Sequence, residues 1–168
     1  RLGLKISASK SKVMLIGNRG VAANLHIQGI QLEKVQEFKY LGIYIDDQLT
    51  FKKQVSYLIE KTKMRLSPMK ALASRTQGAG HCILRMYFIH AIRPMVDYAA
   101  NVLFYLPEKL REKLETIQNS AARIILGAPM WTRIANLQRE ANLIPLHARA
   151  RLMATNSIAR LLQSPDDT

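Results

Sequence analysis

Residues 38–55 read FKYLGIYIDDQLTFKKQV, and the chain changes its structural character within this stretch. The first part, Phe38–Ile45, is rich in aromatic and β-branched residues, a composition typical of a β-strand. Thr50 is suited to capping a helix N-terminus, and beyond it apolar residues recur at alternating steps of four and three. The sequence therefore predicts an α+β fold that is mostly α, with an antiparallel β portion in residues 1–50 and a helical portion in residues 51–168.

Short β-type runs precede this stretch, at residues 13–16, 25–27 and 30–32. Gln28-Gly29 separates the last two runs, and its glycine is suited to the tight turn of a hairpin. We therefore expect these runs and Phe38–Ile45 to form a small antiparallel sheet.

About five helices are expected after residue 50. Pro68 should kink or interrupt the first helix, and Pro94 the second. The third helix has the clearest boundaries, because Pro107 opens it and Gly127 ends it. The five helices are expected to begin near Thr50, Cys82, Pro107, Thr132 and Pro145.

The chain carries a strong positive charge. Its 25 Lys and Arg residues against 12 Asp and Glu residues give a formal net charge of +13 and a pI near 10.2. Such an excess favours a polyanionic partner, nucleic acid before a membrane surface. Between residues 52 and 75 the single acid is Glu60, and the basic residues are Lys52, Lys53, Lys61, Lys63, Arg65, Lys70 and Arg75.

This basic helix has two interpretations. A charged run is most often a solvated helix face. Alternatively, the helix lies along phosphates, where each lysine contact releases condensed counterions and makes binding sensitive to salt. We favour the second interpretation because the charge is of one sign, whereas helices that need only solubility usually mix both signs.

Other classes of site receive little support from the sequence. Cys82 is the single cysteine, which excludes an internal disulfide framework and cysteine-rich zinc clusters and is typical of an intracellular protein. No apolar run approaches the ~18 residues of a membrane-spanning helix, and no charged-then-apolar leader opens the chain. Because the first residue is Arg1 rather than Met, we expect a piece of a longer protein.

Three further kinds of residue are interpreted structurally. The four histidines lack metal-ligand spacing. Cys82 lies in an apolar helical pattern and is expected to be buried. Trp131 is expected to anchor its loop onto the helices, although an exposed tryptophan there could stack on a nucleic-acid base.

Residues 38–51 resemble the strand and turn that close the palm of reverse transcriptases from non-LTR retrotransposons. In that family the strand reads Lys-Tyr-Leu-Gly, followed by apolar residues and an Asp. Leu-Thr-Phe then leads into the thumb. Residues 3–12 are similar to the block just after the family's catalytic strands. Residues 92–99, 114–131 and 137–146 are similar to the thumb-side helices of insect-type elements, and all the blocks occur in the family's order.

The resemblance implies the C-terminal edge of the palm and the thumb of an RNA-directed DNA polymerase. The complete protein would add deoxynucleotides to a DNA primer on an RNA template with Mg²⁺, inside the nucleus, as part of a retrotransposon polyprotein and without a membrane. This chain lacks the family's catalytic aspartates, so we expect it to bind no metal and to be inactive alone. The template, the insertion target, flanking nuclease domains and the oligomeric state do not follow from the sequence.

Tyr44-Ile45-Asp46-Asp47 spells the Tyr-x-Asp-Asp form of the family's active-site turn, whose carboxylate helps to hold two metal ions. We expect a turn or helix-start role instead. An apolar strand should follow such aspartates, whereas Gln48 and polar residues follow here. The block ending at Lys10-Ser11, which should follow the metal site, precedes it, and the first acidic residue of the chain is only Glu33.

The resemblance also implies residue roles. Lys39, Tyr40, Leu41 and Gly42 would grip the primer end, and Gly42 would permit close backbone approach. Lys10 falls where the family places a lysine near the incoming triphosphate, and it could neutralise or protonate the departing pyrophosphate. A plain core strand and an exposed loop lysine are the respective alternatives. The residues expected to track the template–primer backbone are Lys52, Lys53, Lys61, Lys63, Arg65 and Lys70.

Two other functions stay open. The chain could be a stand-alone basic helical module that binds RNA or DNA without polymerase activity, or a structural helical domain whose charge serves solubility. A purely structural domain would bind no nucleic acid at 50–100 mM salt, where the counterion contribution is large. Primer extension after restoring the upstream segment would separate an enzyme fragment from an inactive remnant.

Overall fold

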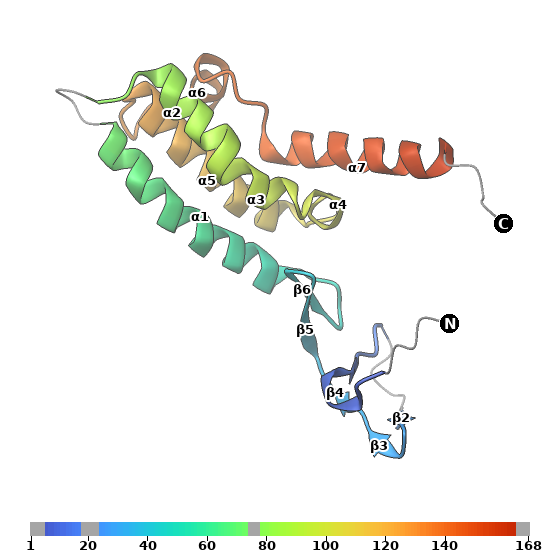
Figure 1. Cartoon of the computed structure of the whole chain (residues 1–168). Coiled ribbons are helices and arrows are strands. Elements are labelled where there is room, and N and C mark those ends of the chain that lie inside the picture. Colours follow the sequence, from blue (N-terminus) through green and yellow to red (C-terminus); the bar gives the residue numbers. More distant parts are fainter. Residues whose placement is uncertain (1–5, 18–23, 74–77, 164–168) are drawn as a thin grey trace. The chain divides into compact units, whose positions relative to one another are not determined.

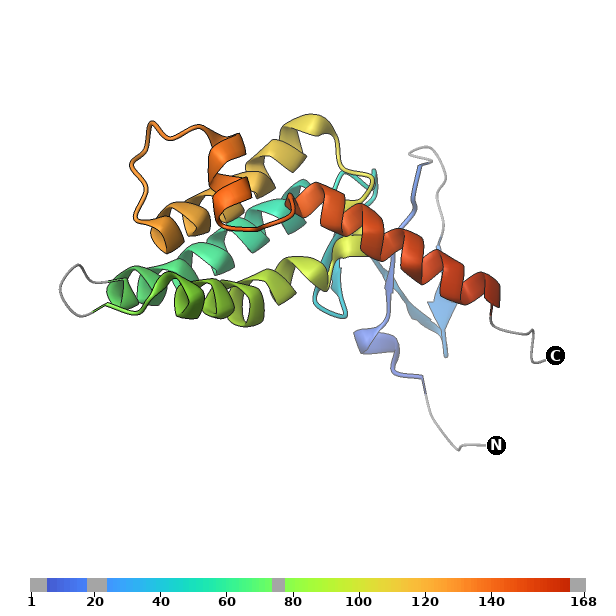
Figure 2. The ribbon, with the colours of Figure 1, turned by 90° about the horizontal axis from the view of Figure 1, so that it is seen from above.

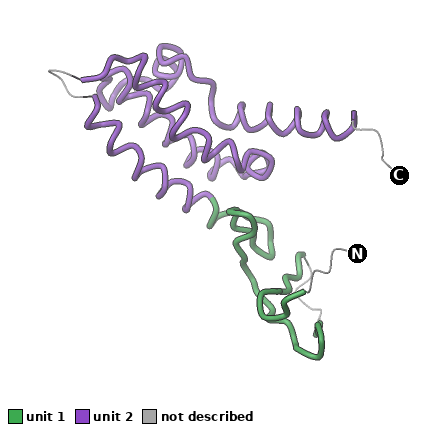
Figure 3. Tube along the Cα trace, viewed as in Figure 1, with its two compact units in different colours: residues 1–54 green, residues 55–168 purple. Residues whose placement is uncertain are grey.

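The computed structural model describes residues 6–17, 24–73 and 78–163, and its elements are labelled in Figure 1. The chain divides into two compact units, residues 1–54 and residues 55–168 (Figure 3). Helices dominate and strands occur in the first unit, so the predicted α+β, mostly α fold class is confirmed. Arg75 and the start of the 3–12 block lie outside the described residues.

The described residues of the first unit form a short 3₁₀ helix and three pairs of strands. The pairs β2–β3 and β5–β6 are antiparallel hairpins, whereas β1 and β4 run parallel, a pairing that the sequence pattern did not indicate. The elements are η1 (Ala8–Lys10), β1 (Lys12–Val13), β2 (His26–Ile27), β3 (Ile30–Gln31), β4 (Glu33–Lys34), β5 (Glu37–Tyr40) and β6 (Ile43–Asp46).

The prediction of a single strand over Phe38–Ile45 is wrong, because this segment is the hairpin β5–β6. Its two-residue turn is Leu41-Gly42, with φ values of 45° and 87°. Positive φ at both central residues gives the turn twist that matches antiparallel strands. Gly42 is suited to this turn, but leucine rarely adopts positive φ, so Leu41-Gly42 was not interpreted as a turn. The hairpin predicted at Gln28-Gly29 is confirmed, with φ values of 54° and 77°.

The connection from β6 to α1 (Lys52–Leu72) closes around one carboxylate. Asp46 accepts hydrogen bonds from the backbone N–H groups of Gln48, Thr50 and Phe51, at 3.2, 2.9 and 2.8 Å. The hydroxyl of Thr50 donates to Asp46 Oδ2 at 3.1 Å, and this is the oxygen that also accepts from Phe51. Thr50 was expected to cap the helix, but its hydroxyl closes the preceding loop instead.

The second unit is built from helices that surround α5 (Glu108–Leu126). The predicted ends of α5 are confirmed, since Pro107 occupies its N-cap and Gly127 its C-cap, with a φ of 60°. Pro68 lies inside α1 and does not end it. The elements after α1 are α2 (His81–Tyr87), the π-helical segment η2 (Phe88–Ile92), α3 (Arg93–Asp97), α4 (Ala100–Leu103), α5 (Glu108–Leu126), α6 (Ile134–Glu140) and α7 (Leu146–Gln163).

Alanines allow α5 to pack closely within this unit. Ala121 and Ala122 are fully buried, and α5 contacts α2, α6 and α7. Phe88, Ile92 and Leu137 fill the surrounding core at 0–1% exposure. Among the described residues, no helix combines the length and the apolar character needed to cross a membrane.

Two burial predictions are wrong. Cys82 is exposed, because it lies on the outer side of α2, whose buried residue is Leu84. Trp131 is 86% exposed and does not anchor its loop. Burial depends on which helix face meets a neighbour, and the local sequence of a short helix or loop does not determine that.

Candidate nucleic-acid interface

The hairpin β5–β6 has two chemically different faces. Cross-strand pairing places Glu37 opposite Asp46 and Lys39 opposite Tyr44. Since side chains alternate along a strand, these four lie on one face, and the other face carries Phe38, Tyr40, Ile43 and Ile45. The four residues predicted to grip the primer are therefore divided between two faces and the turn.

The polar face is organised around one aromatic ring. The Nζ atoms of Lys39 and Lys53 lie 5.1 and 5.0 Å from the centre of the Tyr44 ring, within cation–π range. Lys53 also forms an ion pair with Glu37. The backbone N–H of Tyr44 donates to Gln54 Oε1 at 3.0 Å, and Gln54 is almost completely buried. Lys39 and Lys53 are thus held by contacts within the first unit.

The apolar face opens onto a hollow of about 430 Å³. Lys10 and Lys12 line this hollow together with Tyr40 and Phe38. The structure therefore brings Lys10 and Tyr40, far apart in the sequence, to the same cavity. Tyr40 is 60% exposed and Leu41, at the turn, 71% exposed.

Asp46 has the turn role that the sequence predicts. Partial burial raises the pKa of this carboxyl, but the hydrogen bonds from Thr50, Phe51 and Gln48 outweigh burial and hold the pKa below its usual value. Among the described residues, no group of three or more His, Cys, Asp or Glu side chains is arranged to hold a metal ion.

The basic residues of α1 do not form one surface. Lys63 and Lys70 are seven residues apart, close to two helical turns, and lie on one line of the helix. Lys61 and Arg65 lie four residues apart on a different side of it. The guanidinium of Arg65 donates to the carbonyl oxygen of Ala91, and so joins α1 to the π-helical segment. Lys52 and Lys53 are exposed residues of the first unit.

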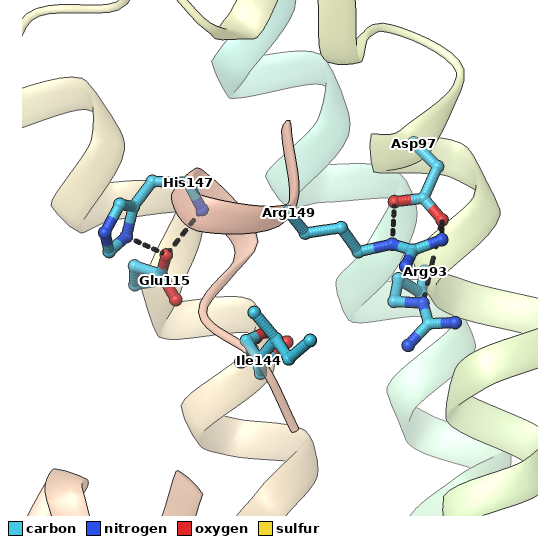
Figure 4. A network of polar contacts seen from close by, with 7 residues as sticks. Arg93, Asp97, Glu115, Ile144, His147 and Arg149 are labelled. Carbon is cyan, nitrogen blue, oxygen red and sulfur yellow. Dashed lines mark hydrogen bonds and ion pairs between the residues drawn. The ribbon is translucent and has the colours of Figure 1, made fainter. Parts of the chain in front are cut away.

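Sequence reasoning missed an ion-pair network that fastens α7 (Figure 4). Arg149 Nε and Nη2 donate to the two carboxylate oxygens of Asp97 at 2.8 and 2.9 Å. Arg93 Nε lies 3.6 Å from Asp97 Oδ2. The hydrogen bonds with Asp97 raise the pKa of Arg149, whereas burial and the nearby Arg149 charge lower that of Arg93. Arg93 and Asp97 have the i,i+4 spacing of a helical ion pair, but Arg149 and Asp97 lie 52 residues apart, so no sequence spacing could indicate that contact.

A second contact holds the start of α7 against α5. Glu115 Oε1 accepts hydrogen bonds from the backbone N–H of His147, at 2.9 Å, and from its ring Nδ1, at 2.8 Å (Figure 4). The buried side chain of Gln118 donates from Nε2 to the carbonyl oxygen of Ile144 at 3.0 Å. The position of α7 is therefore determined by polar anchors as well as by apolar packing.

Comparison with known proteins places these features in context. The chain is 24% identical over 165 residues to the RNA-directed DNA polymerase from mobile element jockey of Drosophila melanogaster, a match that covers 97% of this chain and 18% of the relative. It is 25% identical over 123 residues to the probable RNA-directed DNA polymerase from transposon BS of the same organism, covering 73% of the chain and 14% of the relative.

A third relative, the jockey polymerase of Drosophila funebris, is 26% identical over 141 residues, covering 83% of the chain and 15% of the relative. The chain resembles non-LTR retrotransposon reverse transcriptases. It spans about a sixth of the length of these polymerases. No family model matches the chain, and no solved structure matches it.

Proposed function

We propose that this chain is the palm edge, residues 1–50, and the thumb, residues 51–168, of a non-LTR retrotransposon reverse transcriptase, and that it holds the primer and template. The observation that carries this proposal is the similarity to the jockey polymerase along 97% of the chain. The net charge of +13 supports a phosphate-rich partner.

In this proposal the hairpin β5–β6 grips the primer end. Gly42 has no side chain at the tip of the turn, so a nucleic-acid backbone has room to approach it. Lys39 supplies positive charge on one face, and Tyr40 an aromatic ring on the other. A displacement reaction needs its attacking group aligned closely, and a hairpin that holds the primer end would serve that alignment.

Lys10 is proposed to lie near the incoming triphosphate. It is exposed, and it lines the same hollow as Tyr40, which supports a shared role at the primer end. A lysine ammonium there would neutralise or protonate the departing pyrophosphate.

Along α1, Lys63 and Lys70 are proposed to contact successive backbone phosphates. Such contacts position a duplex without reading its sequence. Lys52, Lys53, Lys61 and Arg65 would add to the field around the helix, although Lys53 and Arg65 also have structural partners.

The chemistry of the whole polymerase is part of the same proposal. Mg²⁺ would neutralise the triphosphate and activate the primer hydroxyl in the complete protein, whose catalytic carboxylates would come from elsewhere in the polyprotein. RNA template and DNA primer would be its partners, inside the nucleus. The residues of this chain would bind and orient these partners.

A labelled RNA–DNA primer–template duplex tests the proposal by fluorescence anisotropy across a range of salt concentrations. The wild-type chain is expected to bind, with a steep loss of affinity as salt rises. Substituting both Lys63→Glu and Lys70→Glu should weaken binding and make the log–log salt slope shallower by about 2, because two phosphate contacts are lost.

The matched control substitutes Lys109→Glu and Lys113→Glu, two exposed lysines on α5, with an identical change in net charge. A chain that binds no duplex at 50–100 mM salt would contradict the proposal. Equal effects of the two double substitutions would remove α1 from the interface, because net charge alone would then explain the binding.

A further inference from the structure

The loop between α5 and α6 presents the chain's single tryptophan to solvent. Trp131 is 86% exposed and the neighbouring Met130 78% exposed. Tryptophan carries a large apolar surface whose exposure to water is unfavourable, and it is usually buried for most of its area. The exposed ring therefore needs an explanation, and the connection that carries it is the orange loop in Figure 2.

Hydrogen bonds hold the backbone of this loop in place. Gly127 turns the chain at the end of α5, and the N–H of Ala128 donates to the carbonyl oxygen of Arg123 at 3.0 Å. The half-buried guanidinium of Arg123 donates to the carbonyl oxygen of Met130 at 3.3 Å. The N–H of Thr132 closes a turn onto the carbonyl oxygen of Pro129 at 3.1 Å. These bonds fix the residues on both sides of Trp131, so the ring is displayed by an ordered turn.

The charge around the loop is positive. Residues 116–139 contain Arg123, Arg133 and Arg139 and no Asp or Glu, and Arg139 is paired with Glu140 at 3.5 Å, so Arg123 and Arg133 supply the positive charge beside the loop. Arg133, two residues after the tryptophan, is exposed at the N-cap of α6. An aromatic ring beside arginines is the combination that binds single-stranded nucleic acid, where the ring stacks on a base and the guanidinium contacts phosphate.

We propose that Trp131 is a base-stacking contact for a single-stranded stretch of nucleic acid, with Arg133 as its phosphate partner. The proposal rests on the proposed function, because it assumes that the chain binds nucleic acid, and it adds a contact for unpaired bases to the duplex contacts of α1. Bases inside a duplex are already stacked on their neighbours, so the ring should prefer a single strand. Charge complementarity favours nucleic acid over an apolar protein partner for this surface.

The single tryptophan makes the test direct. The chain is titrated with oligodeoxythymidylate of about 12 nucleotides, a length within the range that single-strand sites cover, and with the same strand annealed to oligodeoxyadenylate. Stacking should quench the intrinsic fluorescence strongly with the single strand and weakly with the duplex. Anisotropy of a labelled single strand measures affinity in the same samples.

Three substitutions complete the test. Trp131→Ala should weaken single-strand binding by about 5-fold or more, and Trp131→Phe, which keeps a ring, should restore most of the affinity. Tyr105→Ala is the matched control, because Tyr105 is 76% exposed in a different loop, three residues before Glu108, and should leave affinity unchanged.

The outcomes separate this proposal from the proposed function. If single-strand binding is unchanged in Trp131→Ala, or if bound oligonucleotide leaves the fluorescence unaltered, the stacking contact is refuted while the duplex contacts of α1 stand. A tryptophan that serves a protein partner would give this result. If the wild-type chain binds neither single strand nor duplex, both proposals are overturned.

Discussion

Removing Asp97 should destabilise the helical unit more than removing Arg149, although the two form the same ion pair. Asp97→Asn leaves Arg149 and Arg93 facing each other without their counter-charge. Arg149→Met keeps most of the aliphatic stem and leaves Asp97 beside Arg93, at 3.6 Å. The asymmetry follows from the composition of the network, in which two cations share a single anion.

The magnitude follows from the burial of the three side chains. The side chain of Asp97 is 16% exposed, that of Arg93 19% and that of Arg149 27%. The burial of this network therefore lies between that of a surface ion pair and that of a fully buried one. Breaking a buried pair costs about 3–5 kcal/mol, whereas exposed pairs contribute about 0–1 kcal/mol. We therefore expect Asp97→Asn to lower the free energy of unfolding by about 2–3 kcal/mol, and Arg149→Met by about 1–2 kcal/mol.

Urea unfolding followed by helical circular dichroism measures both changes. Arg160→Met, an exposed arginine on the same helix, is the control and should change stability by less than about 0.5 kcal/mol. The double substitution Asp97→Asn with Arg149→Met should be more stable than Asp97→Asn alone, because it relieves the repulsion between the two arginines. The reasoning is refuted if Arg149→Met costs as much as Asp97→Asn, or if the double substitution is the least stable.

Two further predictions concern the first unit. Hydrogen bonds hold the pKa of Asp46 below its usual value, so the stabilisation they give is present above the ordinary aspartate pKa and is lost as pH falls through the lower, folded value. The amide protons of Thr50 and Phe51 should therefore lose exchange protection only below the ordinary aspartate pKa of about 3.9, and Asp46→Asn should abolish this pH dependence. Leu41→Asn should stabilise the hairpin by about 0.5–1 kcal/mol, because asparagine tolerates positive φ better than leucine. If the leucine side chain takes part in primer–template binding, the same substitution should weaken that binding. Unchanged exchange protection of the hairpin amides would contradict the expected stabilisation.

Local signals predicted the parts of the fold that local chemistry determines. Pro107 and Gly127 delimit α5 because a missing N–H suits a helix start and a left-handed residue suits its end. Gln28-Gly29 revealed its hairpin in the same way. The turn at Leu41 was not predicted because leucine is atypical at such a position. Pairing between the flanking strands holds this turn.

The candidate site was less predictable because its geometry depends on distant contacts. Lys39 and Tyr40 were both predicted to grip the primer, but they are adjacent residues of one strand, so their side chains lie on opposite faces of the hairpin. Lys10 and Tyr40 meet at a hollow only through the folding of the first unit. Likewise, periodicity does not indicate the hydrogen bond from Arg123 to Met130, which lies next to the exposed Trp131.

The π-helical segment Phe88–Ile92 has a consequence for how this chain tolerates changes in length. A π-turn holds one more residue than an α-turn, so it is equivalent to a single-residue insertion absorbed within a helix. It precedes Pro94, whose nitrogen has no proton to donate to the preceding turn. A chain lacking one residue here would regain regular α-helical winding without rotating the apolar stripes on either side. A one-position gap among homologous sequences at this place would therefore leave the helical core intact.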